Sequence, residues 1–330
     1  MLAAGCRAAS QAPTGTPATT SPVTTSPVTT SPVTTSWANA DFDELDRFLT
    51  DTATDAFRVV ERGEVVHEWY RSSPTYARDI ASAQKSVLSL LVGRAIGDGL
   101  FTVDTPVDDL LGNGWTPHGR TAEITVAHLL TMTSGLDDQR AVVAEPGTTW
   151  IYSAAFSALF DVLTTTTGRS LDDIADDWLF GPAGATTARY RARPNFPVTP
   201  VGLVATASDL TAIGQLVVDG NQPGLPDDWL DRSFTPIGRA NEAYGLLWWL
   251  NGQESLRLPG VAAARPGALI PSAPVDLVAA LGRDDQKLYV SRDLELVVAR
   301  LGGKANPDVR AALSGFDEQL WAQLTALRTA

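Results

Sequence analysis

The chain has 330 residues and a formal net charge of −13 at pH 7, with 38 acidic against 25 basic side chains. No cluster of lysine or arginine occurs, which argues against a nucleic-acid partner, because phosphate binding requires clustered basic side chains. No run of 18 apolar residues occurs, which excludes a transmembrane helix in these residues, and the single cysteine, Cys6, excludes an intramolecular disulfide.

The first 37 residues differ in composition from the rest of the chain. Residues 8–40 carry no charged side chain, and Thr-Thr-Ser-Pro-Val occurs three times between Thr19 and Val33. A segment of this composition cannot bury a hydrophobic core. Residues 1–37 are therefore predicted to form an extended stalk, and residues 38–330 a globular domain.

The residues around Cys6 suggest an anchor for this stalk. Leu-Ala-Ala-Gly-Cys, ending at Cys6, resembles the lipid-attachment box of bacterial lipoproteins. The resemblance implies an exported domain held at the membrane of the cell envelope, for which more than one acyl chain is needed. Five residues cannot hold the charged and apolar regions of an export signal. Either translation starts further upstream or the match is due to chance.

The globular part opens with strand-forming residues and continues with helical patterns. A short helix is predicted over residues 42–50, and a hairpin in which residues 57–61 and 65–70 flank a glycine-containing turn. From Ser82 to Gly97, apolar residues cover most sides of a helix, which indicates that this helix is buried. Further helices are predicted over residues 125–136, 153–167, 171–179 and 207–219, then strands over 275–281, 287–290 and 294–301, and a last helix over 307–327.

This order of elements predicts the fold class. Strands and helices are segregated along the chain, which indicates an α+β fold and argues against a doubly wound parallel sheet. The N-terminal hairpin is expected to join the C-terminal strands in one antiparallel sheet, because it must bury its apolar face. The helical middle of the chain then forms a lobe against the sheet, and the site is expected in the cleft between them.

Ser82 and Lys85 are the first candidate catalytic pair. Residues three apart share one face of a helix, so the hydroxyl and the amine can touch. The helix N-terminus favours negative charge on Ser82, and burial lowers the pKa of a lysine, which gives a neutral amine that can accept the serine proton. The chain has three lysines, and only Lys85 follows a serine by three residues. The alternative is a serine N-cap followed by a snorkelling lysine.

Further motifs give the chain a family resemblance, which runs from about Val59 to Gly302. They lie, in order, in residues 99–107, 124–136, 150–154, 202–210 and 244–249. With these motifs and Ser-x-x-Lys, the chain resembles the serine β-lactamase-related superfamily, and within it the class C enzymes, the D-amino-acid-directed peptidases and the esterases. The resemblance implies that Ser82 is the nucleophile and Lys85 its proton acceptor.

The resemblance also implies a role for Tyr152. In this superfamily the tyrosine of a Tyr-x-Asn motif faces the nucleophile and shares protons with the lysine, and Tyr152 matches that tyrosine. The third position is Ala154, where asparagine is usual. Alanine cannot hydrogen-bond a substrate amide, which puts amide and β-lactam substrates in doubt. The alternative for Tyr152 is a core aromatic residue with a satisfied hydroxyl.

The third motif of the superfamily lies on a strand and ends in glycine, as Lys-Thr-Gly or His-x-Gly. Gly282 matches the glycine, and Ala280 stands where the basic or polar first residue is usual. The resemblance then implies an oxyanion hole formed by the backbone amides of Ser82 and Arg283. Without a basic residue at 280, the site does not depend strictly on a substrate carboxylate unless Arg283 supplies the charge. The alternative is an ordinary strand end with a polar turn.

Other chemistries find little support in the sequence. His128 lies in an apolar helical pattern and is interpreted as structural, and His67 and His118 have no metal-ligand spacing. There is no Gly-x-Ser-x-Gly elbow and no glycine-rich phosphate loop. The tryptophan pair Trp248 and Trp249 is interpreted as core, with the cleft as the alternative. No metal and no cofactor are expected.

Together these residues predict a serine hydrolase that works by acyl transfer. The expected substrate is a small ester, then an amide such as a D-amino-acid peptide, then a β-lactam. A catalytically silent surface binding domain is the alternative from another class. The missing asparagine and strand base favour that alternative, and Ser82, Lys85 and Tyr152 oppose it. The sequence specifies no oligomeric state.

Overall fold

The computed structural model describes residues 37, 39–117, 121–238, 240–261, 263–306 and 313–329. The chain divides into two units, residues 1–35 and 36–330, and every described residue belongs to the second. Cys6, the stalk repeats and His118 lie outside the described residues, so the lipid anchor stays a prediction. Among the described residues, no helix has the length and apolar character needed to cross a membrane.

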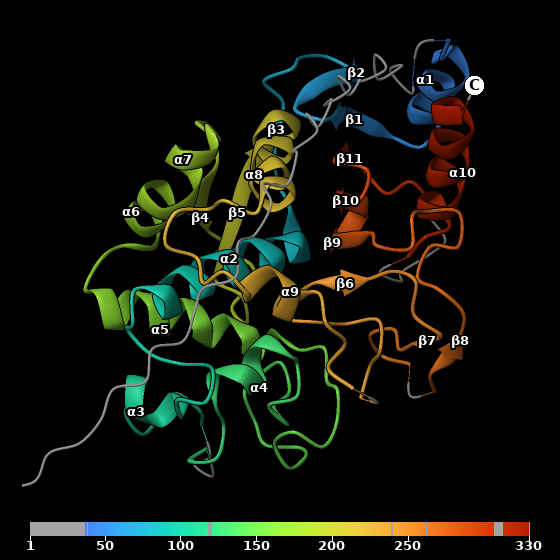
Figure 1. The fold of residues 1–330 in the computed structure, drawn as a ribbon. Helices are drawn as coiled ribbons and strands as arrows, with labels where there is room; N and C mark the ends of the chain where they lie inside the picture. The colour runs from blue at the N-terminus through green and yellow to red at the C-terminus, as the bar shows by residue number, and fades with distance from the viewer. Residues whose placement is uncertain are drawn as a thin grey trace, which may run out of the picture. The chain divides into compact units, whose positions relative to one another are not determined.

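A six-stranded antiparallel sheet in the order β2-β1-β11-β10-β9-β6 lies beside the helical part of the chain (Figure 1). β1 pairs with β11, with Val59 opposite Val298, so the N-terminal hairpin and the C-terminal strands share one sheet, as predicted. The strands are β1 (Thr54–Glu61), β2 (Glu64–Tyr70), β6 (Trp249–Leu250), β9 (Val278–Gly282), β10 (Gln286–Ser291) and β11 (Leu296–Gly302).

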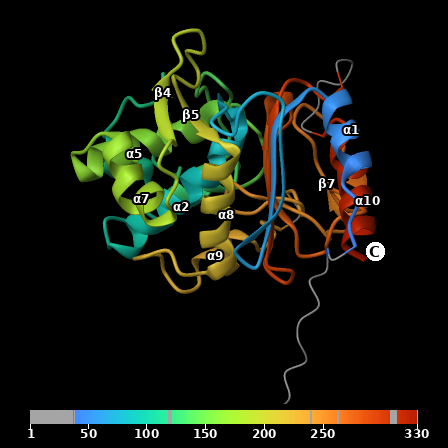
Figure 2. The same ribbon diagram turned by 90° about the horizontal axis from the view of Figure 1, so that it is seen from above.

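Helices cover both faces of this sheet (Figure 2). α8 (Ala207–Asp219) packs on one face, and α1 (Asp43–Asp51) and α10 (Phe316–Thr329) lie on the other. Every residue of β10 and β11 is buried as a result. The contact with α8 is close at Gly214, where an added Cβ would lie 2.4 Å from Val297 Cγ1. A side chain at this helix position would therefore separate α8 from the sheet.

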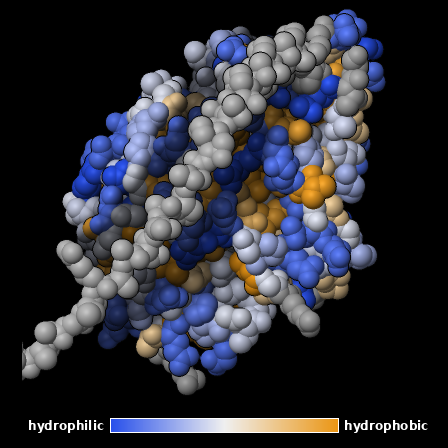
Figure 3. All heavy atoms as spheres, viewed as in Figure 1, coloured by the Kyte–Doolittle hydropathy of each residue, from blue (hydrophilic) through white to orange (hydrophobic). Residues whose placement is uncertain are grey.

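The helical lobe is built around α2 (Gln84–Gly97), which a 3₁₀ turn, η1 (Ala81–Ala83), precedes. α2 is buried on nearly all sides, as its apolar residues predict. The space-filling view shows a mostly hydrophilic face on which hydrophobic residues form small separate patches (Figure 3). The other helical segments are α3 (Val107–Leu111), α4 (Val126–Leu130), η2 (Ala154–Ser157), α5 (Ala158–Thr167), α6 (Leu171–Ala175), η3 (Asp176–Phe180), α7 (Gly181–Ala183) and α9 (Trp229–Ser233), and the turn η4 (Arg283–Asp285) follows β9.

Several features differ from the sequence-based expectation. The last helix, predicted over residues 307–327, is α10 and begins only at Phe316. The helix predicted over residues 125–136 is only α4, because Met132 has a φ of +58°, a left-handed conformation that a helix cannot contain. Short strands were also missed, because most of them have four residues or fewer, and the six residues Val201–Thr206 do not alternate between apolar and polar side chains. They are β3 (Ala77–Asp79), β4 (Arg189–Ala192) and β5 (Val201–Thr206), which form a second sheet in the order β3-β5-β4, and the pair β7 (Ser255–Leu256) and β8 (Arg265–Pro266).

A buried charge network joins α10 to the sheet. Lys287 Nζ lies 2.9 Å from Asp317 Oδ1 and 3.2 Å from Asp285 Oδ1, and all three side chains are buried. The hydroxyl of Tyr289 donates to Asp317 Oδ1 at 2.7 Å. Lys287 and Tyr289 point to the same face of β10 because side chains alternate along a strand. The network therefore fixes where α10 lies on that face.

Asp317→Ala is expected to lower the free energy of unfolding by about 3–5 kcal/mol, the usual cost of breaking a buried ion pair from one side. The substitution removes an acceptor from both Lys287 and Tyr289 in a region that water does not reach. Urea denaturation measures the change, and Gln319→Ala, at an exposed position of the same helix, should stay within about 0.5 kcal/mol of the parent. Equal effects of the two substitutions would contradict the structural role of the network.

Candidate active site

Ser82 and Lys85 lie together at the start of the buried helix. Lys85 Nζ is hydrogen-bonded to Ser82 Oγ at 2.9 Å, so the predicted contact between the two side chains is present. Ser82 is half-buried and lies in η1, two residues before the start of α2 at Gln84. The turn is held by Asp79, whose Oδ1 accepts a hydrogen bond from the amide of Ala81 at 2.8 Å. Ala81 has a φ of +53°, so the chain bends sharply just before Ser82.

The amine of Lys85 lies between aromatic rings and away from water. The side chain is 4% exposed, and Nζ lies 4.4 Å from the ring centroid of Tyr152 and 4.1 Å from that of Phe156. The pKa of Lys85 is lowered to about 7, mainly by burial and also by the positive charge of Arg193, whereas Asp138 acts in the opposite direction. Near neutral pH a substantial fraction of Lys85 is therefore a neutral amine that can accept a proton.

Tyr152 faces the same pair from an aromatic cluster. Its ring lies 5.7 to 6.1 Å, between centroids, from the rings of Trp150, Tyr244 and Trp249. Burial raises the pKa of Tyr152 to about 12, although hydrogen bonds with the side chains of Ser82 and Trp249 lower it in part. Tyr152 is therefore protonated at neutral pH and can donate a proton, whereas Lys85 can accept one.

Ala154 stands two residues after Tyr152 and is buried. Its backbone amide donates to Asp138 Oδ1 at 2.7 Å, and its methyl group offers no hydrogen bond to a substrate. Asp138 is thus linked both to this backbone and, through its charge, to Lys85. Sequence reasoning missed Asp138, which lies in a loop beyond the predicted helix and belongs to no motif.

The end of β9 reaches the turn that carries Ser82. An added Cβ at Gly282 would lie 2.2 Å from the carbonyl oxygen of Ile80, so only glycine allows this approach. Arg283 begins the following turn, and its guanidinium lies 4.8 Å from the ring centroid of Phe196. Ala280 is 1% exposed within the strand. The structure thus brings Gly282 and Arg283 to the serine and leaves position 280 in the core.

A cavity of about 140 Å³ opens at Ser82. Three of its lining residues, Arg193, Phe196 and Thr199, come from the connection between β4 and β5, and sequence reasoning missed them. They lie in a proline-rich segment without periodicity, and only pairing of the short strands places it over the serine. The complete lining is Ala81, Ser82, Gln84, Lys85, Phe156, Arg193, Phe196, Thr199 and Arg283.

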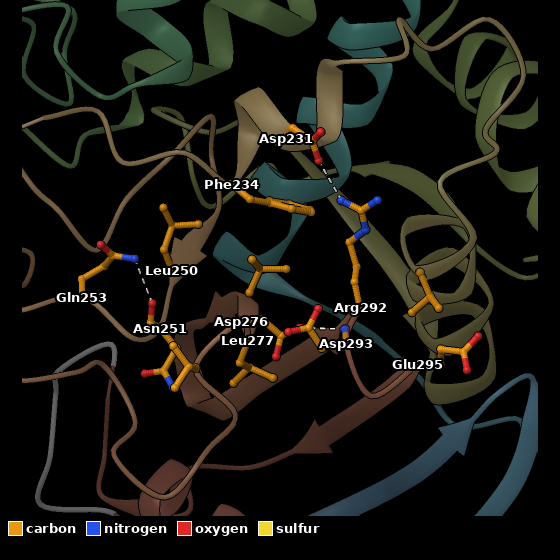
Figure 4. Close-up of a pocket in the computed structure, with 13 residues that line it drawn as sticks. Asp231, Phe234, Leu250, Asn251, Gln253, Asp276, Leu277, Arg292, Asp293 and Glu295 are labelled. Atoms are coloured by element: carbon orange, nitrogen blue, oxygen red, sulfur yellow. Dashed lines mark hydrogen bonds and ion pairs between the residues drawn. The ribbon is translucent and has the colours of Figure 1, made fainter. Parts of the chain in front are cut away.

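The larger cavity, of about 810 Å³, lies at the opposite end of β9 (Figure 4). Three of the charged side chains that line it, those of Asp231, Asp276 and Arg292, are engaged in hydrogen bonds or ion pairs. Arg292 Nη1 lies 2.9 Å from Asp231 Oδ1, and Asp276 accepts hydrogen bonds from the hydroxyl of Ser291 and the amide of Asp293. The residues that line this cavity include no serine, lysine, histidine or tyrosine. The small cavity at Ser82 is therefore the candidate active site.

The histidines that the structure describes are placed outside this cavity. His128 Nδ1 accepts a hydrogen bond from the amide of Thr125 at 3.1 Å, which caps α4 and fits a structural role. His67 Nε2 lies 2.7 Å from Asp46 Oδ1. Across the described part of the chain, no group of three or more His, Cys, Asp or Glu side chains is arranged to hold a metal ion.

The β-lactamase family model matches residues 43–313 of the chain, which includes every residue placed at this site. No curated protein sequence matches the chain significantly.

Three solved structures share the fold. A proposed β-lactamase from Bacteroides dorei has a TM-score of 0.71 at 16% identity, over 88% of this chain and 100% of that one. A proposed 6-aminohexanoate-dimer hydrolase from Bacillus anthracis has a TM-score of 0.67 at 18% identity, over 85% and 81% of the two chains. EstCE1, a hydrolase with promiscuous acyltransferase activity, has a TM-score of 0.63 at 14% identity, over 87% and 97%.

Gly282→Ala is expected to force the end of β9 away from the Ser82 turn, because its Cβ would overlap the carbonyl oxygen of Ile80. Overpacking of this kind costs roughly 1–3 kcal/mol, which a thermal unfolding curve measures as a lower Tm. Gly303→Ala is the matched control, since its Cβ would lie at an ordinary 3.4 Å from Ala53 Cβ. A Gly282 variant as stable as the Gly303 variant would contradict this close approach.

Proposed function

The chain belongs to the β-lactamase family and is a serine hydrolase, and on that premise we propose that it cleaves small carboxylic esters through an acyl-enzyme on Ser82. The observation that carries the proposal is the contact between Lys85 Nζ and Ser82 Oγ at 2.9 Å. A lysine with a pKa of about 7 matches the task of a general base near neutral pH.

In the proposed reaction, Ser82 Oγ attacks the carbonyl carbon of the ester while Lys85 Nζ takes the hydroxyl proton. The backbone amides of Ser82 and Arg283 stabilise the oxyanion that forms. Tyr152, protonated at neutral pH, donates its proton to the leaving alkoxide and regains one from the Lys85 ammonium. Water then attacks the acyl-enzyme with the same base, and Ser82 is released as the free hydroxyl.

Two positions favour esters over amides. Ala154 supplies no side-chain amide to orient a substrate amide, and Ala280 supplies no charge. An ester has a better leaving group than an amide, so it needs less assistance at these positions. The likeness of fold to EstCE1 is in keeping with this choice. An amide hydrolase is the second candidate, in keeping with the likeness to the Bacillus anthracis structure.

Ser82→Ala should abolish covalent labelling by a fluorophosphonate, and mass spectrometry of the labelled parent should place the adduct on the peptide that contains Ser82. Lys85→Ala should lower kcat on the order of 10³-fold, within the usual contribution of a positioned base. Lys85→Arg should fail as badly, because arginine keeps its proton. Tyr152→Phe should lower kcat and leave the fold intact.

Ser86→Ala is the matched control for the serine, since Ser86 lies one turn further along α2, where its hydroxyl donates to the carbonyl oxygen of Leu247. This variant should still be labelled. An adduct on another serine, such as Ser134 or Ser153, would overturn the mechanism. A folded parent protein that is never labelled would favour a catalytically silent binding domain.

Short-chain activated esters should be hydrolysed with a higher kcat/KM than nitrocefin or a D-Ala-D-Ala peptide, because the latter two need the amide positioning that Ala154 does not supply. A steady-state comparison on the same protein preparation tests this ranking. A higher kcat/KM for nitrocefin would reverse the order of the candidate substrates. Ser82→Ala gives the background rate for each of them.

A further inference from the structure

We propose that Arg193 is a positioning residue for proton transfer from Ser82 to Lys85. Held on Asp79, its guanidinium fixes the turn that carries Ser82 and keeps a positive charge beside an amine that must be neutral to react. The inference rests on the proposed function, in which Lys85 is the general base. Arg193 comes from the connection between β4 and β5, far from Ser82 in the sequence.

The first line of evidence is a chain of contacts from Arg193 to the nucleophile. Arg193 Nε and Nη2 donate to the two carboxylate oxygens of Asp79. The same carboxylate accepts the amide of Ala81 at 2.8 Å, directly before Ser82. Since a bidentate pair fixes the plane of both groups, the position of Arg193 and the sharp bend at Ala81 depend on each other.

The second line of evidence is the space made for this pair. An added Cβ at Gly202 of β5 would lie 2.0 Å from Arg193 Nε and 2.5 Å from Asp79 Oδ2, so β5 can pass beside the pair only with glycine at this position. The backbone of Arg193 is also held, because its amide donates to the carbonyl oxygen of Pro200 at 2.7 Å. The side chain of Arg193 is only 12% exposed. The positive charge of Arg193 is therefore held in one position, and water screens it poorly there.

The third line of evidence is the balance of charges around Lys85. Arg193 and Arg283 line the Ser82 cavity with it, from two different connections. Asp138, in the loop before η2, favours the ammonium form, whereas Arg193 lowers the pKa of Lys85. Asp79 faces Arg193, and Tyr152 is neutral. Without Arg193, the carboxylate of Asp138 would favour a protonated amine with no opposing positive charge, and a protonated amine cannot accept the proton of Ser82.

The test is the pH dependence of fluorophosphonate labelling in the full chain and in Arg193→Gln and Arg193→Lys. In the parent, the labelling rate should rise through the Lys85 pKa of about 7 and then level off. Loss of the positive charge raises that pKa, so in Arg193→Gln the rise should move to higher pH by about 1 unit, the low end of what one neighbouring charge does. The plateau should fall as well, because the turn is released.

Arg193→Lys separates charge from geometry. Lysine keeps the charge but cannot form the bidentate pair. The plateau labelling rate of Arg193→Lys should therefore fall, while the pH at which labelling rises should stay near that of the parent. Asp138→Asn removes an opposing charge and should move the rise to lower pH. If the role of Arg193 is purely structural, the plateau labelling rate should fall in both Arg193→Gln and Arg193→Lys, and the pH at which the rate rises should change in neither.

If the labelling rate of Arg193→Gln rises at the same pH as that of the parent, the proposal is overturned. If that variant does not fold by circular dichroism, Arg193→Met removes the same charge and is judged by the same criterion. A parent protein that is never labelled would overturn the proposed function, and with it this inference. If the parent is labelled, but the labelling rate of the uncharged variant rises at the same pH as that of the parent, the inference is overturned and the proposed function is not.

Discussion

The proposed chemistry depends on one constraint: the amine of Lys85 is shielded from water while it is hydrogen-bonded to the hydroxyl of Ser82. Lys85 lies on a helix that is buried on nearly all sides, and aromatic rings cover its Nζ. Burial penalises the charged form of lysine, so a group that is an acid in water becomes a base in the protein. The neighbouring Tyr152 responds in the opposite sense, because burial penalises its phenolate. One environment thus separates the acid from the base.

The rest of the fold delivers groups to this pair from distant parts of the chain. The sheet ends at Gly282, where the missing side chain lets the strand touch the Ser82 turn. The second, small sheet supplies Asp79 from β3 and Arg193 from the end of β4, and their ion pair crosses β5 at Gly202. Each approach requires a glycine, because two backbones or an ion pair occupy the space of a Cβ.

A second buried lysine in the molecule, Lys287, has a structural role. Lys287 is as inaccessible as Lys85, but it lies between the carboxylates of Asp285 and Asp317. Paired carboxylates stabilise an ammonium, whereas a nearby arginine disfavours it and so adds to the effect of its desolvation. Lys287 therefore joins α10 to the sheet as a structural ion pair, and Lys85 is available for proton transfer. The partners, and not burial alone, decide the role.

The sequence by itself determined the α+β class, the joining of the N-terminal hairpin to the C-terminal strands, and the Ser82–Lys85 contact, since periodicity and a three-residue spacing on a helix are local properties. It also matched Tyr152 and Gly282 to family motifs. Only the tertiary structure placed Asp79, Asp138 and Arg193 at the site. These residues lie on short strands and loops, where no periodic pattern exists; the charges of Asp138 and Arg193 act on Lys85 through space, and Asp79 holds Arg193 and the turn before Ser82. Asp138 and Arg193 are distant from Ser82 in the sequence, and such contacts in space leave no signal in a single chain; Asp79 is close in the sequence, but its role depends on the conformation of the turn and on Arg193.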